Sequence, residues 1–130
     1  RSTLFPYTTL FRSWLTRFIV ELGMGSDLHG GDVTKAAMRA VRDAVSRSCL
    51  CGLFEVAGLK RPEDMFIHLK VCCPTPERLD RERVAGSVPF GKVELEVREG
   101  GMVAEGIQLP QLGEGSSIVV ALVSLTVCVE

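Results

Sequence analysis

The residues best suited to chemistry lie in one glycine-rich segment between Gly23 and Lys35. His29 lies in this segment, and its side-chain type has an unperturbed pKa that suits proton transfer near neutrality. Asp27 precedes it by two residues, and Lys35 ends the segment. We therefore take His29, Asp27 and Lys35 as the candidate catalytic residues.

The same segment has the composition of an anion-binding site. Glycines let the backbone approach an anion, and the first amides of a following helix point toward it. Lys35 and Arg39 are four residues apart and share a helix face, so both could meet an anionic ligand near the helix start. The candidate ligand-binding residues are Gly25, Gly30, Gly31, Asp32, Thr34 and Arg39.

Each of these residues also has a purely structural interpretation. Asp27 and Asp32 are typical of a turn and of a helix cap. His29 could lie in a solvent-exposed loop, and the basic residues could form a solvent-exposed helix face. The functional hypothesis depends on the cluster as a whole, because polar connections on a rigid scaffold are where sites concentrate.

The segment does not match the sequence motifs of nucleotide-binding or metal-binding sites. The dinucleotide fingerprint needs glycine where Leu28 stands, and a P-loop needs Lys and Ser or Thr after Gly30, where Gly31 and Asp32 stand. Metal-dependent hydrolysis is a weak alternative, because the loop supplies one histidine and the five cysteines lack paired C-x-x-C spacings. The sequence predicts neither a cofactor nor a metal, and its cysteine usage favours the cytoplasm.

The candidate site lies between a strand and a helix. Residues 17–22 form an apolar run that predicts a strand ended by Gly23. The pattern changes to a helical period from Asp32, which can cap the helix. Small residues on the apolar face let this helix lie close to a sheet. The face comprises Val33, Ala37, Ala40, Val41, Ala44, Val45 and Ser48.

The remaining chain predicts three strands and one helix. Strict alternation over residues 92–98 predicts an antiparallel strand with its charges facing water. His68 is expected to be a partly exposed strand residue. The predicted elements are strands at 65–72, 92–98 and 118–129, with a helix at 77–87 and an irregular connection over 102–117.

The element order β-α-β-α-β-β predicts an α+β fold, with a mixed four-stranded sheet and two helices on one face. This order is loosely similar to the small trimeric folds of the chorismate-mutase type, whose sites lie between subunits. Two helices leave the other sheet face bare, and in a small protein another subunit often covers such a face. We therefore expect a homo-oligomer, a trimer or a larger ring, with the site near a subunit interface.

Residues 1–13 do not resemble natural protein sequence. They repeat Thr-Leu-Phe, contain no acidic residue and fit neither a helical nor a strand period. Their back-translation matches the forward adapter of short-read sequencing libraries in frame. We interpret them as translated adapter and residues 14–130 as a single α+β domain. Without Arg1 and Arg12 the chain has 13 basic and 16 acidic residues, and the formal net charge changes from −1 to −3.

The composition of the domain argues against nucleic acids and membranes as partners. It lacks a basic stripe to neutralise phosphates and an aromatic set on which bases stack. Its longest apolar stretch, residues 118–129, is shorter than the roughly 20 residues that a membrane helix needs.

Several segments resemble the conserved-hypothetical family called Lin0512, and the resemblance extends over residues 17–130. It implies a small stand-alone protein of about this length and no particular reaction. The segments are residues 18–30 (FIVELGMGSDLHG), 32–37 (DVTKAA), 39–41, 46–50, 89–91, 99–102 and 118–121.

Two functions stay open at this point. The first is an enzyme or binding protein for a small anionic metabolite, with its site at the glycine-rich loop. The second is a non-catalytic assembly or regulatory module, in which the loop packs against a neighbouring subunit.

Overall fold

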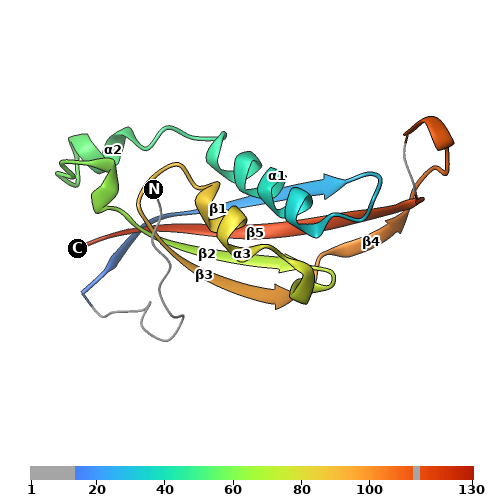
Figure 1. Ribbon diagram of the computed structural model, residues 1–130. Helices are drawn as coiled ribbons and strands as arrows, with labels where there is room; N and C mark the ends of the chain where they lie inside the picture. The colour runs from blue at the N-terminus through green and yellow to red at the C-terminus, as the bar shows by residue number, and fades with distance from the viewer. Residues whose placement is uncertain (1–13, 113–114) are drawn as a thin grey trace.

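The computed structural model describes residues 14–112 and 115–130, which form a mixed sheet with helices on one face (Figure 1). The predicted α+β class is confirmed, with five strands in the described residues where four were expected. Residues 1–13, interpreted above as adapter, lie outside the described residues. The strands are β1 (Thr16–Asp27), β2 (Phe66–Cys73), β3 (Lys92–Glu99), β4 (Met102–Glu105) and β5 (Ser117–Val129). The helices are α1 (Val33–Val45), α2 (Cys51–Glu55) and α3 (Arg81–Gly86), with 3₁₀ turns at Pro62–Asp64, Pro76–Arg78 and Pro110–Leu112.

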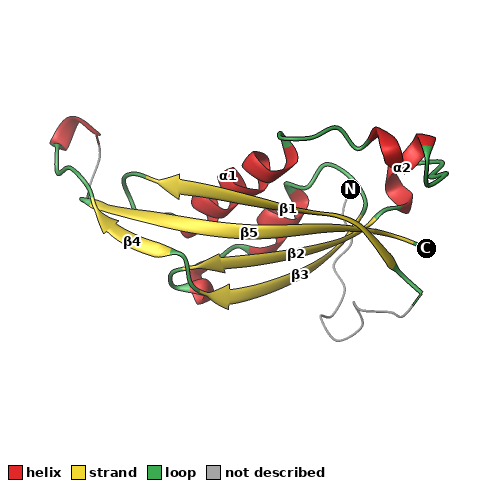
Figure 2. Cartoon of the chain, turned by 180° about the vertical axis from the view of Figure 1, so that it is seen from behind, coloured by secondary structure: helices red, strands yellow, loops and turns green. Residues whose placement is uncertain are grey.

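The sheet has the strand order β1-β5-β2-β3, and β4 pairs with β5 beyond the end of β2. The long strand β5 is therefore central, as predicted, and runs antiparallel to β1, β2 and β4. Strands β2 and β3 run parallel to each other. Figure 2 shows the sheet from behind, where no described helix covers it. We call this side the open face.

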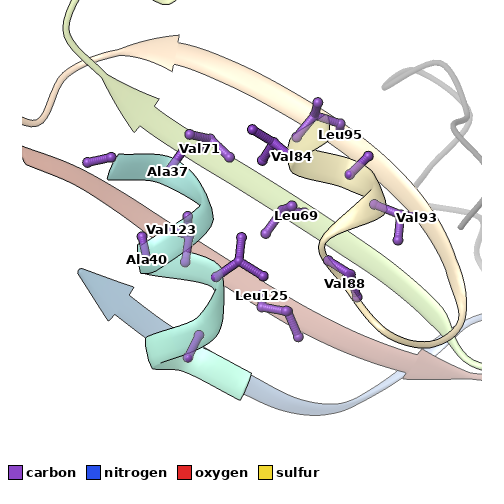
Figure 3. Packing of buried hydrophobic residues seen from close by; sticks show 14 of the residues in the cluster. Ala37, Ala40, Leu69, Val71, Val84, Val88, Val93, Leu95, Val123 and Leu125 are labelled. Carbon is purple, nitrogen blue, oxygen red and sulfur yellow. The ribbon is translucent and has the colours of Figure 1, made fainter. Parts of the chain in front are cut away.

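The core lies between the sheet and helices α1 and α3 (Figure 3). Leu69 and Leu125 are fully buried there, so each side chain contributes about 2 kcal/mol through removal of apolar surface from water. The predicted face of α1 is confirmed at its first five positions, from Val33 to Ala44, whereas Val45 is half-buried and Ser48 is exposed. The buried apolar residues of α1 are Val33, Ala36, Ala37, Ala40, Val41 and Ala44.

Two glycines of β1 lie directly beneath α1. A Cβ atom on Gly23 would be 2.2 Å from the carbonyl oxygen of Ala40, and one on Gly25 would be 2.3 Å from that of Ala36. Backbone atoms cannot give way as a flexible side chain can, so only glycine fits at both positions. The prediction that the strand ends at Gly23 was therefore wrong. These glycines continue the strand to Asp27 and admit the helix.

Strand β3 departs from its prediction in direction and in exposure. It pairs parallel to β2 because the intervening segment, which includes α3, crosses over the sheet and returns the chain to the same end. Glu94 and Glu96 are buried rather than facing water. The alternation correctly separated the two faces of the strand, but it did not reveal that the charged face is buried as well as the apolar one.

His68 is also buried, contrary to its prediction, and lies on the open face beside β3. Its Nε2 atom is 3.2 Å from Glu96 Oε1, and Arg98 Nε donates to Glu96 Oε2 at 2.7 Å. Burial lowers the pKa of His68, and this effect outweighs the opposite effect of Glu96. Burial raises the pKa of Glu96, but the hydrogen bond from Arg98 and the nearby positive charges lower it overall.

The other differences are local. The short helix α2, between α1 and β2, was not predicted. Strand β4 lies within the expected irregular segment over 102–117, and α3 is shorter than the predicted helix at 77–87. Among the described residues, no helix is long and apolar enough to cross a membrane.

Candidate functional site

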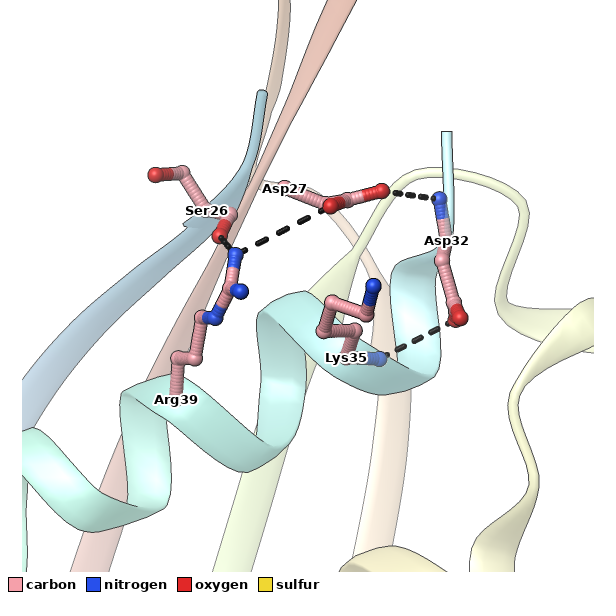
Figure 4. A network of polar contacts seen from close by, with 5 residues as sticks. All are labelled: Ser26, Asp27, Asp32, Lys35 and Arg39. Carbon is pink, nitrogen blue, oxygen red and sulfur yellow. Dashed lines mark hydrogen bonds and ion pairs between the residues drawn. The ribbon is translucent and has the colours of Figure 1, made fainter. Parts of the chain in front are cut away.

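Asp27 is the last residue of β1, and its carboxylate organises the loop that follows (Figure 4). Its side chain is only 6% exposed. Oδ2 accepts the backbone N–H of Asp32 at 2.9 Å, and Oδ1 lies 3.7 Å from Arg39 Nη1. Arg39 Nη1 also donates to the carbonyl of Ser26 at 2.7 Å. Asp27 thus closes the loop and fixes the Arg39 guanidinium beside the strand end.

Asp32 begins α1 as predicted. Its Oδ1 atom accepts the backbone N–H of Lys35 at 3.1 Å, which satisfies one of the unpaired amides of the first helical turn. Gly30 and Gly31 have φ angles of +91° and +64°, a left-handed conformation that glycine adopts without strain. A hollow of about 240 Å³ lies here, lined by Gly30, Gly31, Asp32, Val33 and Arg78.

Thr34 connects the two helices of the covered face. It is buried, and its Oγ1 accepts the backbone N–H of Asp80 at 2.9 Å. Asp80 in turn caps α3, because its Oδ1 accepts the backbone N–H of Arg83 at 3.2 Å. Thr34 therefore sets the position of α3 beside the first turn of α1.

Two of the predicted site residues differ from the rest. Gly25 lies beneath α1, where its lack of a side chain serves packing. The half-buried His29 has a buried Nδ1 atom with no hydrogen-bond partner among the described residues. Among the described residues of this loop, His29 therefore has the buried side-chain nitrogen whose hydrogen-bonding capacity is unused.

Lys35 and Arg39 line a second cavity, which lies between α1 and α3 and has a volume of about 340 Å³. Arg42, one helical turn beyond Arg39, and Arg83 of α3 join them there. Met38 and Ser87 complete its lining, and none of the lining residues is acidic. We call this cavity the basic groove.

Sequence reasoning missed Arg42 and Arg83 as members of the site. Arg42 follows Lys35 by seven residues, or two helical turns, so extending the helix face could have found it. Arg83 lies 41 residues beyond Arg42, and the packing of α3 beside α1, which includes the hydrogen bond between Thr34 and Asp80, brings it near. No local pattern in the sequence could have indicated that neighbour.

The basic groove and the loop hollow differ in their electrostatics. The hollow includes Asp32, whose carboxylate caps α1, and the buried carboxylate of Asp27 binds the Asp32 amide beside it. The basic groove combines four cationic side chains, and one of them, Arg39, also forms an ion pair with Asp27. Of the two cavities, the basic groove is the better environment for a negatively charged ligand.

The chain is similar to known proteins in sequence and in fold. No curated protein matches it. A crystal structure of an FtsZ-like protein of unknown function from Nostoc punctiforme is 41% identical and has a TM-score of 0.83, covering 89% of this chain and 97% of that one. The family model described as "Conserved hypothetical protein (Lin0512_fam)" matches residues 17–127, where the sequence had indicated that resemblance. The chain therefore belongs to the Lin0512 family.

Proposed function

We propose that the protein binds a small, multiply charged anion in the basic groove between α1 and α3. The observation that carries the proposal is the convergence of four cationic side chains on one cavity whose lining contains no carboxylate. The proposal keeps Lys35 and Arg39 from the predicted site and moves the ligand from the glycine-rich loop to the adjacent helix pair.

The composition of the groove favours oxyanions over other ligands. Three of its four cations are arginines, whose planar guanidinium groups bind phosphate or carboxylate oxygens in pairs. Lys35 and Arg42 are about 10 Å apart along the helix axis, at 1.5 Å per residue. The volume of about 340 Å³ is at the lower end of known ligand pockets, so the ligand is the size of a small metabolite.

The loop residues then have supporting roles. Asp27 and Asp32 hold Arg39 and the start of α1 in place, and Thr34 fixes the second helix. His29, the candidate for proton transfer from its residue type, has a buried Nδ1 atom that makes no hydrogen bond to the described residues, and it does not line the groove. Binding in the groove does not require that chemistry, so the two roles can be tested separately.

Calorimetric titration with inorganic triphosphate at low ionic strength tests the binding. The paired substitution Arg42→Gln and Arg83→Gln removes two cations from the groove, and we expect the affinity to fall at least about tenfold, since one charge-assisted hydrogen bond contributes about 1.5–3 kcal/mol. Arg61→Gln is the matched control, because Arg61 pairs with Asp64 outside the groove.

The outcomes separate the groove from the loop. The Arg61 variant and His29→Ala should bind triphosphate as the unsubstituted protein does. Equal affinity in the Arg42 and Arg83 double variant, or no binding of millimolar triphosphate by the unsubstituted protein, contradicts the proposal.

A further inference from the structure

The open face of the sheet divides into an apolar part and a charged part. Along the cross-strand ladders, Leu22 of β1 lies beside Ser124, Lys70 and Glu96 in turn, so polarity increases from β1 toward β3. The large side chains of the apolar part are exposed by 47% to 64%. They are Val20, Leu22, Met24, Met102 and Leu122, which we call the apolar patch.

The register makes the apolar patch continuous. Met24 lies opposite Leu122, and Met102 of β4 lies opposite Val120, the next residue of β5 on the same face. The patch therefore extends from β1 across β5 to β4 without a charged side chain among its members. Contiguous exposed apolar surface of this kind marks interaction sites in soluble proteins.

From this arrangement we infer that the open face binds a second copy of this chain, sheet against sheet. The area is of the right order. Strands about 4.8 Å apart, with a rise of about 3.3 Å per residue, give roughly 450 Å² for β1, β4 and β5, which carry the patch, and roughly 700 Å² for the whole face. A contact that buries the roughly 800 Å² per partner of a stable complex therefore extends beyond the patch onto the charged part. Side chains of two such faces interdigitate across about 10 Å in sheet sandwiches.

The distribution of charge also fits a second copy. The formal net charge of the chain is −1, so two copies repel each other weakly. The charged part of the face contains side chains of both signs. Glu96 accepts a hydrogen bond from Arg98 and lies opposite Lys70 of β2. A contact centred on the apolar patch places these groups toward its rim, which is the usual anatomy of an interface. Methionines suit the centre because their flexible side chains fill irregular gaps.

Light scattering after gel filtration tests the inference on the full chain at micromolar and at sub-millimolar concentration. We expect a mass of at least twice the chain mass for the unsubstituted protein. The paired substitution Leu22→Glu and Met24→Glu should give the monomer mass, because two like-charged clusters would face each other across the contact. Val56→Glu is the matched control, since Val56 is 86% exposed and lies at the end of α2, away from the open face.

Circular dichroism shows whether the double variant folds. If it does not fold, Met102→Glu on the short strand β4 provides the same test with a smaller perturbation. A monomeric unsubstituted protein at the higher concentration overturns the inference, and so does a folded patch variant that assembles as the unsubstituted protein does. Binding of the monomer to neutral phosphatidylcholine vesicles would assign the patch to a lipid surface instead and would also overturn it.

Discussion

The two faces of strand β1 place opposite demands on neighbouring residues. On the helix side, Gly23 and Gly25 cannot carry a side chain, because the backbone of α1 occupies the space. On the open side, Leu22 and Met24 carry large side chains that are 64% and 58% exposed. One strand thus provides close helix packing on one side and an apolar surface on the other. Within β1, the side packed under α1 therefore requires residues without a side chain, and the open side carries large ones.

The largest expected effect is at Gly25. In Gly25→Val, the new Cβ atom meets backbone atoms of Ala36 and Ala40 at 2.3 Å, so α1 must move away from the sheet. We expect loss of cooperative folding or destabilisation by at least about 4 kcal/mol in urea denaturation. Met24→Val introduces the same side chain on the open face and should change the free energy of unfolding by less than about 1 kcal/mol. Similar values for the two variants would contradict the comparison of the two faces.

A second effect contrasts two leucines of β5. Leu125 is fully buried under the helices, so Leu125→Ala should leave a cavity and cost about 2–5 kcal/mol. Leu122 is 47% exposed on the open face, and Leu122→Ala should cost less than about 1.5 kcal/mol in the monomer. Urea titrations at low protein concentration measure both values. An effect at Leu122 that increases with protein concentration would show that the residue becomes buried by self-association.

The glycines show how far sequence reasoning can reach. A glycine at the end of an apolar run can belong to a turn, to an anion-binding site or to a close contact with another element. The sequence alone does not distinguish these three roles. The predicted apolar face of α1 was the better guide, because its alanines already indicated close approach to a sheet. What the sequence could not show is that Gly23 and Gly25 lie opposite those alanines. That match depends on the register between β1 and α1.

The candidate site could be predicted only where its contacts are local in sequence. Asp32 was expected as a helix cap and is one, because capping depends on the few residues that follow it. The contact of Thr34 with Asp80 spans 46 residues and left no signal in either segment. The burial of Glu96 likewise involves residues distant in sequence, since Glu96 contacts His68 of β2. Local patterns predicted the elements, while partners distant in sequence determined the groove.

The contact between Thr34 and Asp80 should have an intermediate effect. Thr34→Val keeps the shape of the side chain but removes the oxygen that accepts the Asp80 amide. We expect destabilisation by about 1–2 kcal/mol, the usual cost of leaving a partly buried donor unpaired. The same variant should weaken triphosphate binding, because α3, which carries Arg83, loses one of its contacts with α1. Thr16→Val, at an exposed position of β1, is the control and should alter neither measurement.

The smallest expected effect is a pH dependence that originates on the open face. Burial lowers the pKa of His68, and Lys70 lowers it further, while Glu96 acts in the opposite direction. Below pH 6.5 the unfolded chain therefore binds a proton that folded His68 resists, so the free energy of unfolding should fall as the pH decreases from about 7 to 5. Glu96 keeps its charge in this window because its pKa lies below the ordinary 4.5, and its contribution to stability decreases only at lower pH.

Two variants give this pH dependence its test. His68→Gln should flatten the profile of urea midpoint against pH between 5 and 7, since the titrating group is gone. Lys70→Gln should reduce the slope without abolishing it, because burial, the larger cause of the shift, remains. An unchanged slope in the His68 variant would assign the pH dependence to another residue. A slope of opposite sign in the unsubstituted protein would mean that Glu96 dominates over burial, and His68 would then be charged in the folded protein.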